Sequence, residues 1–320
     1  MSTAKARRFQ VEHFSDFRYG EPAHGSLMLL RLHPRDDGGQ RVLAFSLHID
    51  PLAAPTAFED AFGNTSQLFN IHRRHRQTTV LARAQVETAE APAETHLQSD
   101  AWTALPEIAD PVDFWEFLHA SRFARPSAAL DAFIAANDIR RGADPLSSLR
   151  EMAYTLHRAF TYEPGSTAVD SPIERVLETG RGVCQDYTHV MIAIARSWGV
   201  PSRYVSGYLH FEGASGEQSM IGASHSWAEF LLPDLGWIGI DPTNDTLADH
   251  RHVRVAVGRD YADAAPTRGA VFGGGDSTLE VRVTVVRGDE PRPQGEARAE
   301  RPNLRNLGPT PYVHRASADQ

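Results

Sequence analysis

Apolar and polar residues alternate along much of the first part of the chain. Every second residue from Leu43 to Ile49 is apolar, and the same alternation returns from Val80 to Val86. Alternation of this kind is typical of strands with one buried face. Turn-forming sequences separate the alternating runs at Pro34–Gly39, Asp50–Pro51 and Gly63–Asn64. We therefore predict an antiparallel β-sandwich domain over residues 1–90.

The pattern changes to helical spacing after a segment rich in Ala, Glu, Thr and Pro (residues 89–100), which we expect to be a linker. Apolar residues from Leu146 to Phe160 recur as on one face of an amphipathic helix. A short helix is predicted from Ser171, because Pro172 and Glu174 complete a capping-box signature. The next predicted helix runs from Cys184 until Gly199 and Pro201 end it. Strand-like runs follow at residues 203–211, 226–232, 237–240, 253–257 and 279–286.

These elements predict an α+β protein. Residues 101–286 are expected to form a second domain, in which helices pack on an antiparallel sheet. Residues 287–320 are rich in Pro, Gly, Arg and Glu, and we predict that they form a disordered tail.

Composition and charge narrow the classes of function. The 320 residues carry a formal net charge of −9, which is not expected of a protein that binds nucleic acid. No apolar run has the ~18 residues needed to cross a membrane, and residues 1–17 lack a signal-peptide pattern. A single cysteine cannot form an internal disulfide, so we expect a cytoplasmic protein. The oligomeric state cannot be read from the sequence.

The single cysteine, Cys184, begins a predicted helix, and Gly180 and Gly182 precede it. Unpaired N–H groups and the helix dipole at such a position favour the thiolate, which is the reactive form of cysteine. The backbone N–H of Cys184 could also help to hold an oxyanion beside its own sulfur. The position therefore suits a nucleophile.

His225 and Asp241 flank a predicted hairpin whose turn is Pro233–Gly236. Antiparallel pairing would place Asp241 opposite about Ala228, so both side chains would lie near the open end of the hairpin. A carboxylate on one imidazole nitrogen fixes the tautomer and leaves the other nitrogen for the thiol. We predict Cys184, His225 and Asp241 as nucleophile, base and orienting carboxylate of an acyl-transfer site.

Structural explanations exist for each of these residues taken alone. A free cysteine is more often a small buried side chain than a nucleophile, and Asp before Pro-Thr is often a turn residue. His189 and Asp186 lie round the predicted helix from Cys184, and we expect them to anchor it. The basic run His72–Arg76 is a poor cation site, and we predict neither a metal site nor a cofactor.

The run Gly182–His189 resembles the nucleophile segment of bacterial transglutaminase-like proteins. Six further runs resemble segments of that family, the first two of them in its β-rich N-terminal domain: His33–Arg35, Asp60–Asn64, Ser202–Tyr208, Ser224–Glu229, Gly236–Asn244 and Val257–Asp263. The resemblance extends from about Phe9 to Val286. It implies a papain-like transglutaminase core whose Cys-His-Asp triad is Cys184, His225 and Asp241.

Two departures from related families concern the oxyanion. Gln185 follows the nucleophile, where animal transglutaminases have a tryptophan. Glu178 stands six residues before Cys184, where papain-like proteases have a glutamine. The second oxyanion donor is therefore unassigned, and Tyr162 is our candidate.

We expect a cysteine-dependent enzyme that cleaves a peptide or glutamine-type amide through a thioester, with a peptide or protein as its substrate. If water resolves the thioester, the protein is a peptidase or amidase. We favour this outcome because the sequence shows no amine pocket or calcium loop. Resolution by an amine would make it a protein-glutamine transglutaminase. A non-catalytic binding protein on the same fold is the remaining alternative.

Overall fold

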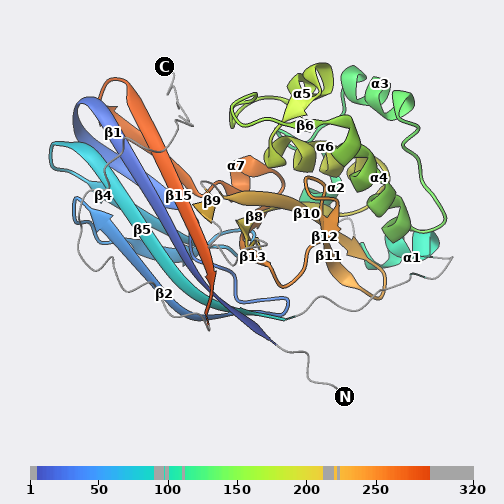
Figure 1. Ribbon diagram of the computed structural model, residues 1–320, viewed down its shortest axis with the longest axis horizontal. Coiled ribbons are helices and arrows are strands. Elements are labelled where there is room, and N and C mark those ends of the chain that lie inside the picture. The colour runs from blue at the N-terminus through green and yellow to red at the C-terminus, as the bar shows by residue number, and fades with distance from the viewer. Residues whose placement is uncertain are drawn as a thin grey trace.

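The structure, a computed structural model, describes residues 6–89, 97, 101–109, 112–211, 220–221 and 224–288. A large antiparallel sheet lies beside a smaller sheet that is covered by helices (Figure 1). The α+β class is therefore confirmed. Most of the predicted linker, and the predicted tail from residue 289 onward, lie outside the described residues.

Strand β1 runs through both halves of the large sheet. The strands of this sheet are β1 (Arg7–Leu30), β2 (Gln40–Asp50), β3 (Thr56–Glu59), β4 (Thr65–Ile71), β5 (His75–Thr88), β9 (Met220–Ile221), β14 (Thr267–Gly273) and β15 (Ser277–Arg287). The first half of β1 pairs with β5 and β15, and its second half pairs with β4 and β14. A buried cluster containing Leu30, Phe69 and Val80 joins the two halves, so they pack face to face.

Two strands of the large sheet come from the end of the described chain. β15 pairs with β1 from Phe9–Arg287 onward, and β14 pairs with it as far as Leu30–Thr267. The predicted boundaries had assigned both strands to the second domain, and their pairing places them in the first sheet instead. Alternation shows which face of a strand is buried, but it does not show which strand is its neighbour.

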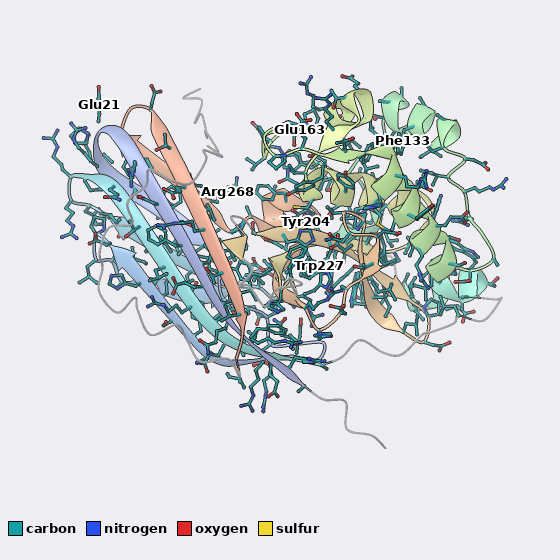
Figure 2. The ribbon with its side chains drawn as sticks, viewed as in Figure 1. Glu21, Phe133, Glu163, Tyr204, Trp227 and Arg268 are labelled. Atoms are coloured by element: carbon teal, nitrogen blue, oxygen red, sulfur yellow. The ribbon has the colours of Figure 1, made fainter. Side chains whose placement is uncertain are left out.

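The second sheet is antiparallel and has the strand order β12-β11-β10-β8-β13. Its strands are β8 (Ser202–Leu209), β10 (His225–Leu232), β11 (Gly236–Asp241), β12 (Thr246–Leu247) and β13 (His252–Gly258). Helix α6 (Cys184–Ser197), which is buried along nearly its whole length, packs on β10 and β8. Tyr204 lies on the face toward α6, and Trp227 lies on the opposite face (Figure 2).

The other helices range from 4 to 15 residues, and local chemistry sets the starts of α4 and α5. They are α1 (Ala101–Ile108), α2 (Trp115–Leu118), α3 (Ala128–Ala136), α4 (Pro145–Ala159), α5 (Ile173–Thr179) and α7 (Tyr261–Ala264), with β6 (Thr161–Tyr162) and β7 (Arg181–Gly182) as a parallel pair. The Asp144 side chain caps α4 by accepting the Ser147 N–H at 2.9 Å. Helix α5 begins at Ile173 rather than at Ser171, because the Ser171 hydroxyl accepts the Ala168 N–H (2.9 Å) instead of capping the helix.

The first sheet packs against the second sheet at strands β8 and β13. Phe9 and Val86 of the first sheet share a buried cluster with Tyr208 and Val253 of the second. Strand β13 is the edge of the second sheet, and two amide side chains of the N-terminal domain pair with its backbone. Gln40 pairs with the N–H and C=O of Arg254, and Asn64 pairs with those of Val257. The N-terminal domain thus covers an edge that would otherwise be open.

Among the described residues, no helix has both the length and the apolar character needed to cross a membrane.

Candidate active site

Helix α6 carries Cys184 at its first position. Val183 is the N-cap, and Asp186 Oδ2 accepts both the Val183 N–H (2.7 Å) and the Thr167 hydroxyl (2.6 Å). A Cβ on Gly182 would lie 2.9 Å from Asp186 Oδ2, so the approach requires glycine. Asp186 anchors the helix start, as expected, and Cys184, the first residue of the helix, is half-buried. The sequence therefore builds a rigid platform for the thiol.

His225 opens β10 and Asp241 closes β11, so the hairpin brings them together. Ala228 pairs with Ile240, which is one residue from the predicted register. His225 Nε2 lies 2.7 Å from Asp241 Oδ2, and the Asp241 side chain is fully buried. Because Nε2 contacts the carboxylate, Nδ1 is the nitrogen that remains for the thiol.

The Asp241 carboxylate is held by further donors. Its Oδ1 accepts the backbone N–H groups of Thr243 (3.0 Å) and Asn244 (3.2 Å). Its Oδ2 accepts the Asn244 side-chain amide at 2.7 Å and faces His252 Nε2 at 3.3 Å. A buried carboxylate with this many donors has a fixed orientation and remains ionised.

The pKa values of the three groups are shifted in the direction that acyl transfer requires. Burial alone would raise the pKa of Asp241, but the charge and hydrogen bond of His225 hold it far below its usual range. Burial alone would lower the pKa of His225, but the Asp241 charge raises it to about 10. Burial alone would raise the pKa of Cys184, but hydrogen bonds from His225 and Ser226, with the His225 charge, lower it. The three residues therefore favour a thiolate–imidazolium pair.

His225, Asp241 and His252 also form a group that could hold a metal ion, because one ligand atom of each lies within 4.8 Å of the others. Both histidines already direct Nε2 at the same carboxylate oxygen. A cation would have to replace these hydrogen bonds, so the geometry favours the hydrogen-bonded arrangement.

Three residues around the triad were not predicted. Asn244 lies in a segment whose resemblance to the family was noted, and an Asp followed three residues later by a potential donor could have indicated its role. Ser226 directly follows His225 in the sequence. It lies beside the Cys184 thiol because of tertiary contacts, which the local sequence does not show. His252 comes from β13, which is separated from β11 by β10 and β8 in the sheet order. Nothing in the local sequence indicates that His252 reaches Asp241.

Two other predicted residues lie as follows. His189 is buried and accepts the Tyr261 N–H at 3.1 Å, so it anchors the segment after β13 to α6. Tyr162 is half-exposed and pairs with Gly182, close in sequence to Cys184. Its role as oxyanion donor stays a prediction.

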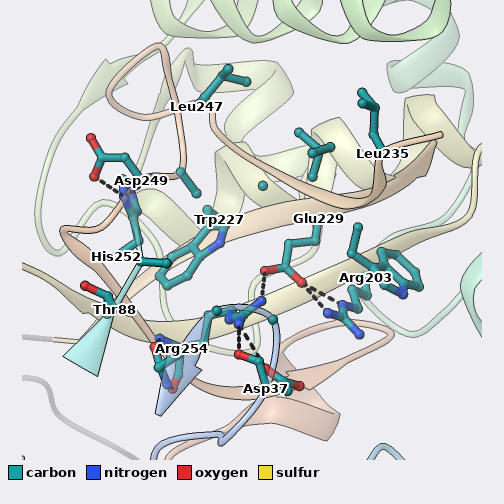
Figure 3. Close-up of a pocket in the computed structure, with 18 of the residues that line it drawn as sticks. Asp37, Thr88, Arg203, Trp227, Glu229, Leu235, Leu247, Asp249, His252 and Arg254 are labelled. Atoms are coloured by element: carbon teal, nitrogen blue, oxygen red, sulfur yellow. Dashed lines mark hydrogen bonds and ion pairs between the residues drawn. The ribbon is translucent and has the colours of Figure 1, made fainter. Parts of the chain in front are cut away.

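A cavity of about 550 Å³ lies between the N-terminal domain and the second sheet (Figure 3). Trp227 lines it beside Glu229, which forms ion pairs with both Arg203 and Arg254. Neither Cys184 nor His225 lines this cavity, whereas His252 does. The cavity is therefore separate from the thiol, but it is lined by His252, which contacts Asp241.

Comparison with known protein families identifies the superfamily of the chain. The Transglutaminase-like superfamily matches residues 134–242, and the Bacterial transglutaminase-like N-terminal region matches residues 9–87. The chain belongs to the transglutaminase-like superfamily. The matched range, residues 134–242, includes Cys184, His225 and Asp241.

Relatives of this transglutaminase-like protein occur in several bacteria. An uncharacterized protein of Mycobacterium tuberculosis is 33% identical over 295 residues, which cover 87% of this chain and 92% of the relative. A protein-glutamine gamma-glutamyltransferase of Pseudomonas aeruginosa is 27% identical over 141 residues, which cover 42% of this chain and 20% of that protein. A crystal structure of a candidate cysteine protease from Cytophaga hutchinsonii matches with a TM-score of 0.72 at 20% identity, over 90% of this chain and 92% of that chain. This likeness confirms the fold.

Proposed function

We propose that this transglutaminase-like protein is a cysteine-dependent acyl-transfer enzyme that cleaves a peptide or glutamine-type amide. The observation that carries the proposal is the 2.7 Å bond between His225 Nε2 and buried Asp241, with Cys184 at a helix start on the other side of the imidazole. Such an arrangement activates a nucleophile and holds the proton that the leaving group needs.

In the proposed reaction the Cys184 thiolate attacks the amide carbonyl carbon. The backbone N–H of Cys184 would stabilise the oxyanion, and Tyr162 is the candidate second donor. His225 gives its proton to the amine as the C–N bond breaks, which leaves a thioester on Cys184. Water then attacks the thioester, His225 takes its proton, and breaking of the C–S bond restores the thiolate. Asp241 stabilises the imidazolium in both halves.

Hydrolysis is the favoured outcome, because water is abundant and an amine has to be bound in order to compete. Transfer to an amine is the second candidate, since the Pseudomonas aeruginosa relative carries that name. A peptide that contains glutamine, incubated with and without a primary amine, separates the two: hydrolysis gives the acid in both mixtures, and transfer gives the amine adduct. A cytoplasmic location and a peptide or protein partner are parts of the same proposal.

The test of the proposal is the pH dependence of iodoacetamide alkylation at Cys184, read by intact mass. The single cysteine makes the adduct unambiguous. Because the pKa of Cys184 is lowered, the wild type is expected to label well below the ~8.5 of a free thiol. His225→Ala should label more slowly, with its midpoint moved toward that value. His48→Ala, on the exposed side of β2, is the matched control and should behave as wild type.

A thiol that labels with the ordinary profile in both wild type and His225→Ala would refute an activated nucleophile. The non-catalytic binding protein would then be the better explanation. If the thiol is activated, turnover of a peptide amide by wild type but not by Cys184→Ala completes the argument.

A further inference from the structure

His252 is buried behind the triad, and its ring has a defined proton. The Asp249 backbone N–H donates to His252 Nδ1 at 3.1 Å. Nδ1 therefore provides a lone pair, and the ring carries its proton on Nε2. Nε2 lies 3.3 Å from Asp241 Oδ2, so the histidine donates to the catalytic carboxylate. A second proton on the ring would face Asp249 Oδ1 (3.3 Å) and leave the Nε2–H where it is.

The ring of His252 is also confined. It meets the indole of Trp227 edge to face at a centroid distance of 5.1 Å, and Trp227 has no exposed surface. Only 2% of the His252 side chain is exposed. A ring packed in this way cannot turn away from Asp241 unless neighbouring side chains move.

The N-terminal domain holds the backbone on both sides of His252. The Thr88 hydroxyl donates to the His250 carbonyl at 2.8 Å. The Gln40 side chain donates to the Arg254 carbonyl and accepts the Arg254 N–H, each at 2.8 Å. Figure 3 shows Thr88, His252 and Arg254 at this junction. The first domain therefore fixes the residue that contacts the carboxylate of the second.

We propose that His252 is a positioning residue for Asp241, through which the N-terminal domain sets the orientation of the triad. The inference rests on the proposed acyl-transfer function. The Nε2–H adds a donor to the carboxylate oxygen that His225 uses, and it restrains that oxygen in the direction of the imidazole. Without this donor, Asp241 would stabilise the His225 imidazolium less well. The imidazolium would in turn stabilise the Cys184 thiolate less well.

Two variants of His252 separate a positioning role from a packing role. His252→Leu fills the site but removes the donor, whereas His252→Gln places an amide N–H near the position of Nε2. We expect the alkylation midpoint of Cys184 to rise by about half a unit to one unit in His252→Leu, which is about three- to tenfold slower labelling below the midpoint. His252→Gln should stay close to wild type. His48→Leu, on exposed β2, is the control for a histidine substitution elsewhere.

Each outcome supports or overturns one claim. If His252→Leu is folded by urea titration and labels as wild type, the positioning role is wrong. If His252→Gln is as slow as His252→Leu, the ring acts by packing alone. Should His252→Leu not fold, His252→Asn replaces it: its shorter amide corresponds to Nδ1 rather than Nε2, so it should be slow where His252→Gln is fast. An ordinary thiol profile in the wild type would instead overturn the proposed function. EDTA in every sample keeps cations from masking these differences.

Discussion

Asn64 offers a sharp test of how the two domains are joined. Its side chain is fully buried, and it makes two hydrogen bonds to the backbone of one residue on edge strand β13. Nδ2 donates to the Val257 carbonyl at 2.7 Å, and Oδ1 accepts the Val257 N–H at 2.8 Å. Oδ1 also accepts from Arg35 Nη1 at 2.8 Å. An amide side chain thus stands where a neighbouring strand would be.

Asn64→Ala would leave two buried backbone groups of Val257 without partners. An orphaned buried donor or acceptor costs about 1 to 3 kcal/mol, so the two together should lower the free energy of unfolding by about 2 to 6 kcal/mol. The upper part of that range applies if water cannot enter the space that alanine leaves. Asn64→Asp keeps the acceptor but sets an oxygen against the Val257 carbonyl and near Asp60, so it should not restore stability.

Urea unfolding, followed by circular dichroism and extrapolated linearly, measures this free energy. Asn70→Ala is the matched control, because Asn70 is exposed on β4 of the same domain. We expect the control to lie within about 0.5 kcal/mol of wild type. An Asn64→Ala variant no less stable than Asn70→Ala would refute the reasoning, since it would show that the edge of β13 does not need its cover.

Two further predictions concern buried ionisable groups. Asp186→Ala should destabilise the fold by about 1 to 2 kcal/mol and slow the alkylation of Cys184, because α6 loses its cap at Val183; urea titration and labelling kinetics measure both, and unchanged kinetics would contradict a role in the platform. Burial lowers the pKa of His13 from 6.5 to about 4, so the unfolded chain binds more protons below pH 6.5 and stability falls from there toward pH 4. The loss at pH 5 should be about 2 kcal/mol smaller in His13→Gln than in wild type, and an equal loss in both proteins would argue against a neutral His13.

The helix start at Cys184 and the contact between His225 and Asp241 could be predicted because they obey local rules. Glycines before a helix start indicate a tight approach, and Gly182 does lie against Asp186. A hairpin with a short turn brings its two ends together, so the pairing of His225 with Asp241 followed to within one residue. These are relations between residues that the chain places near one another, and they need no knowledge of the wider fold.

The rest of the site depends on contacts between distant strands. His252 reaches Asp241 although β8 and β10 stand between β13 and β11 in the sheet order. The alternation around Leu43 was also misleading in detail, because the register of β2 shifts between Val42 and Ala44 and leaves Leu43 exposed. A bulge adds one residue without changing the composition of a strand, so the pattern alone cannot locate it.

The return of β14 and β15 to β1 sets an order for biosynthesis. β1 leaves the ribosome first among the described strands, but one neighbour of its first half, β15, is made last. Until then β1 presents a long row of unpaired N–H and C=O groups, which is an edge prone to association with other chains. Val283 and Val285 of β15 also complete the apolar cluster between the two domains. The nascent chain therefore keeps an unpaired strand edge and an incomplete apolar cluster while its helical domain is synthesised. Only β15, the last described strand, completes both.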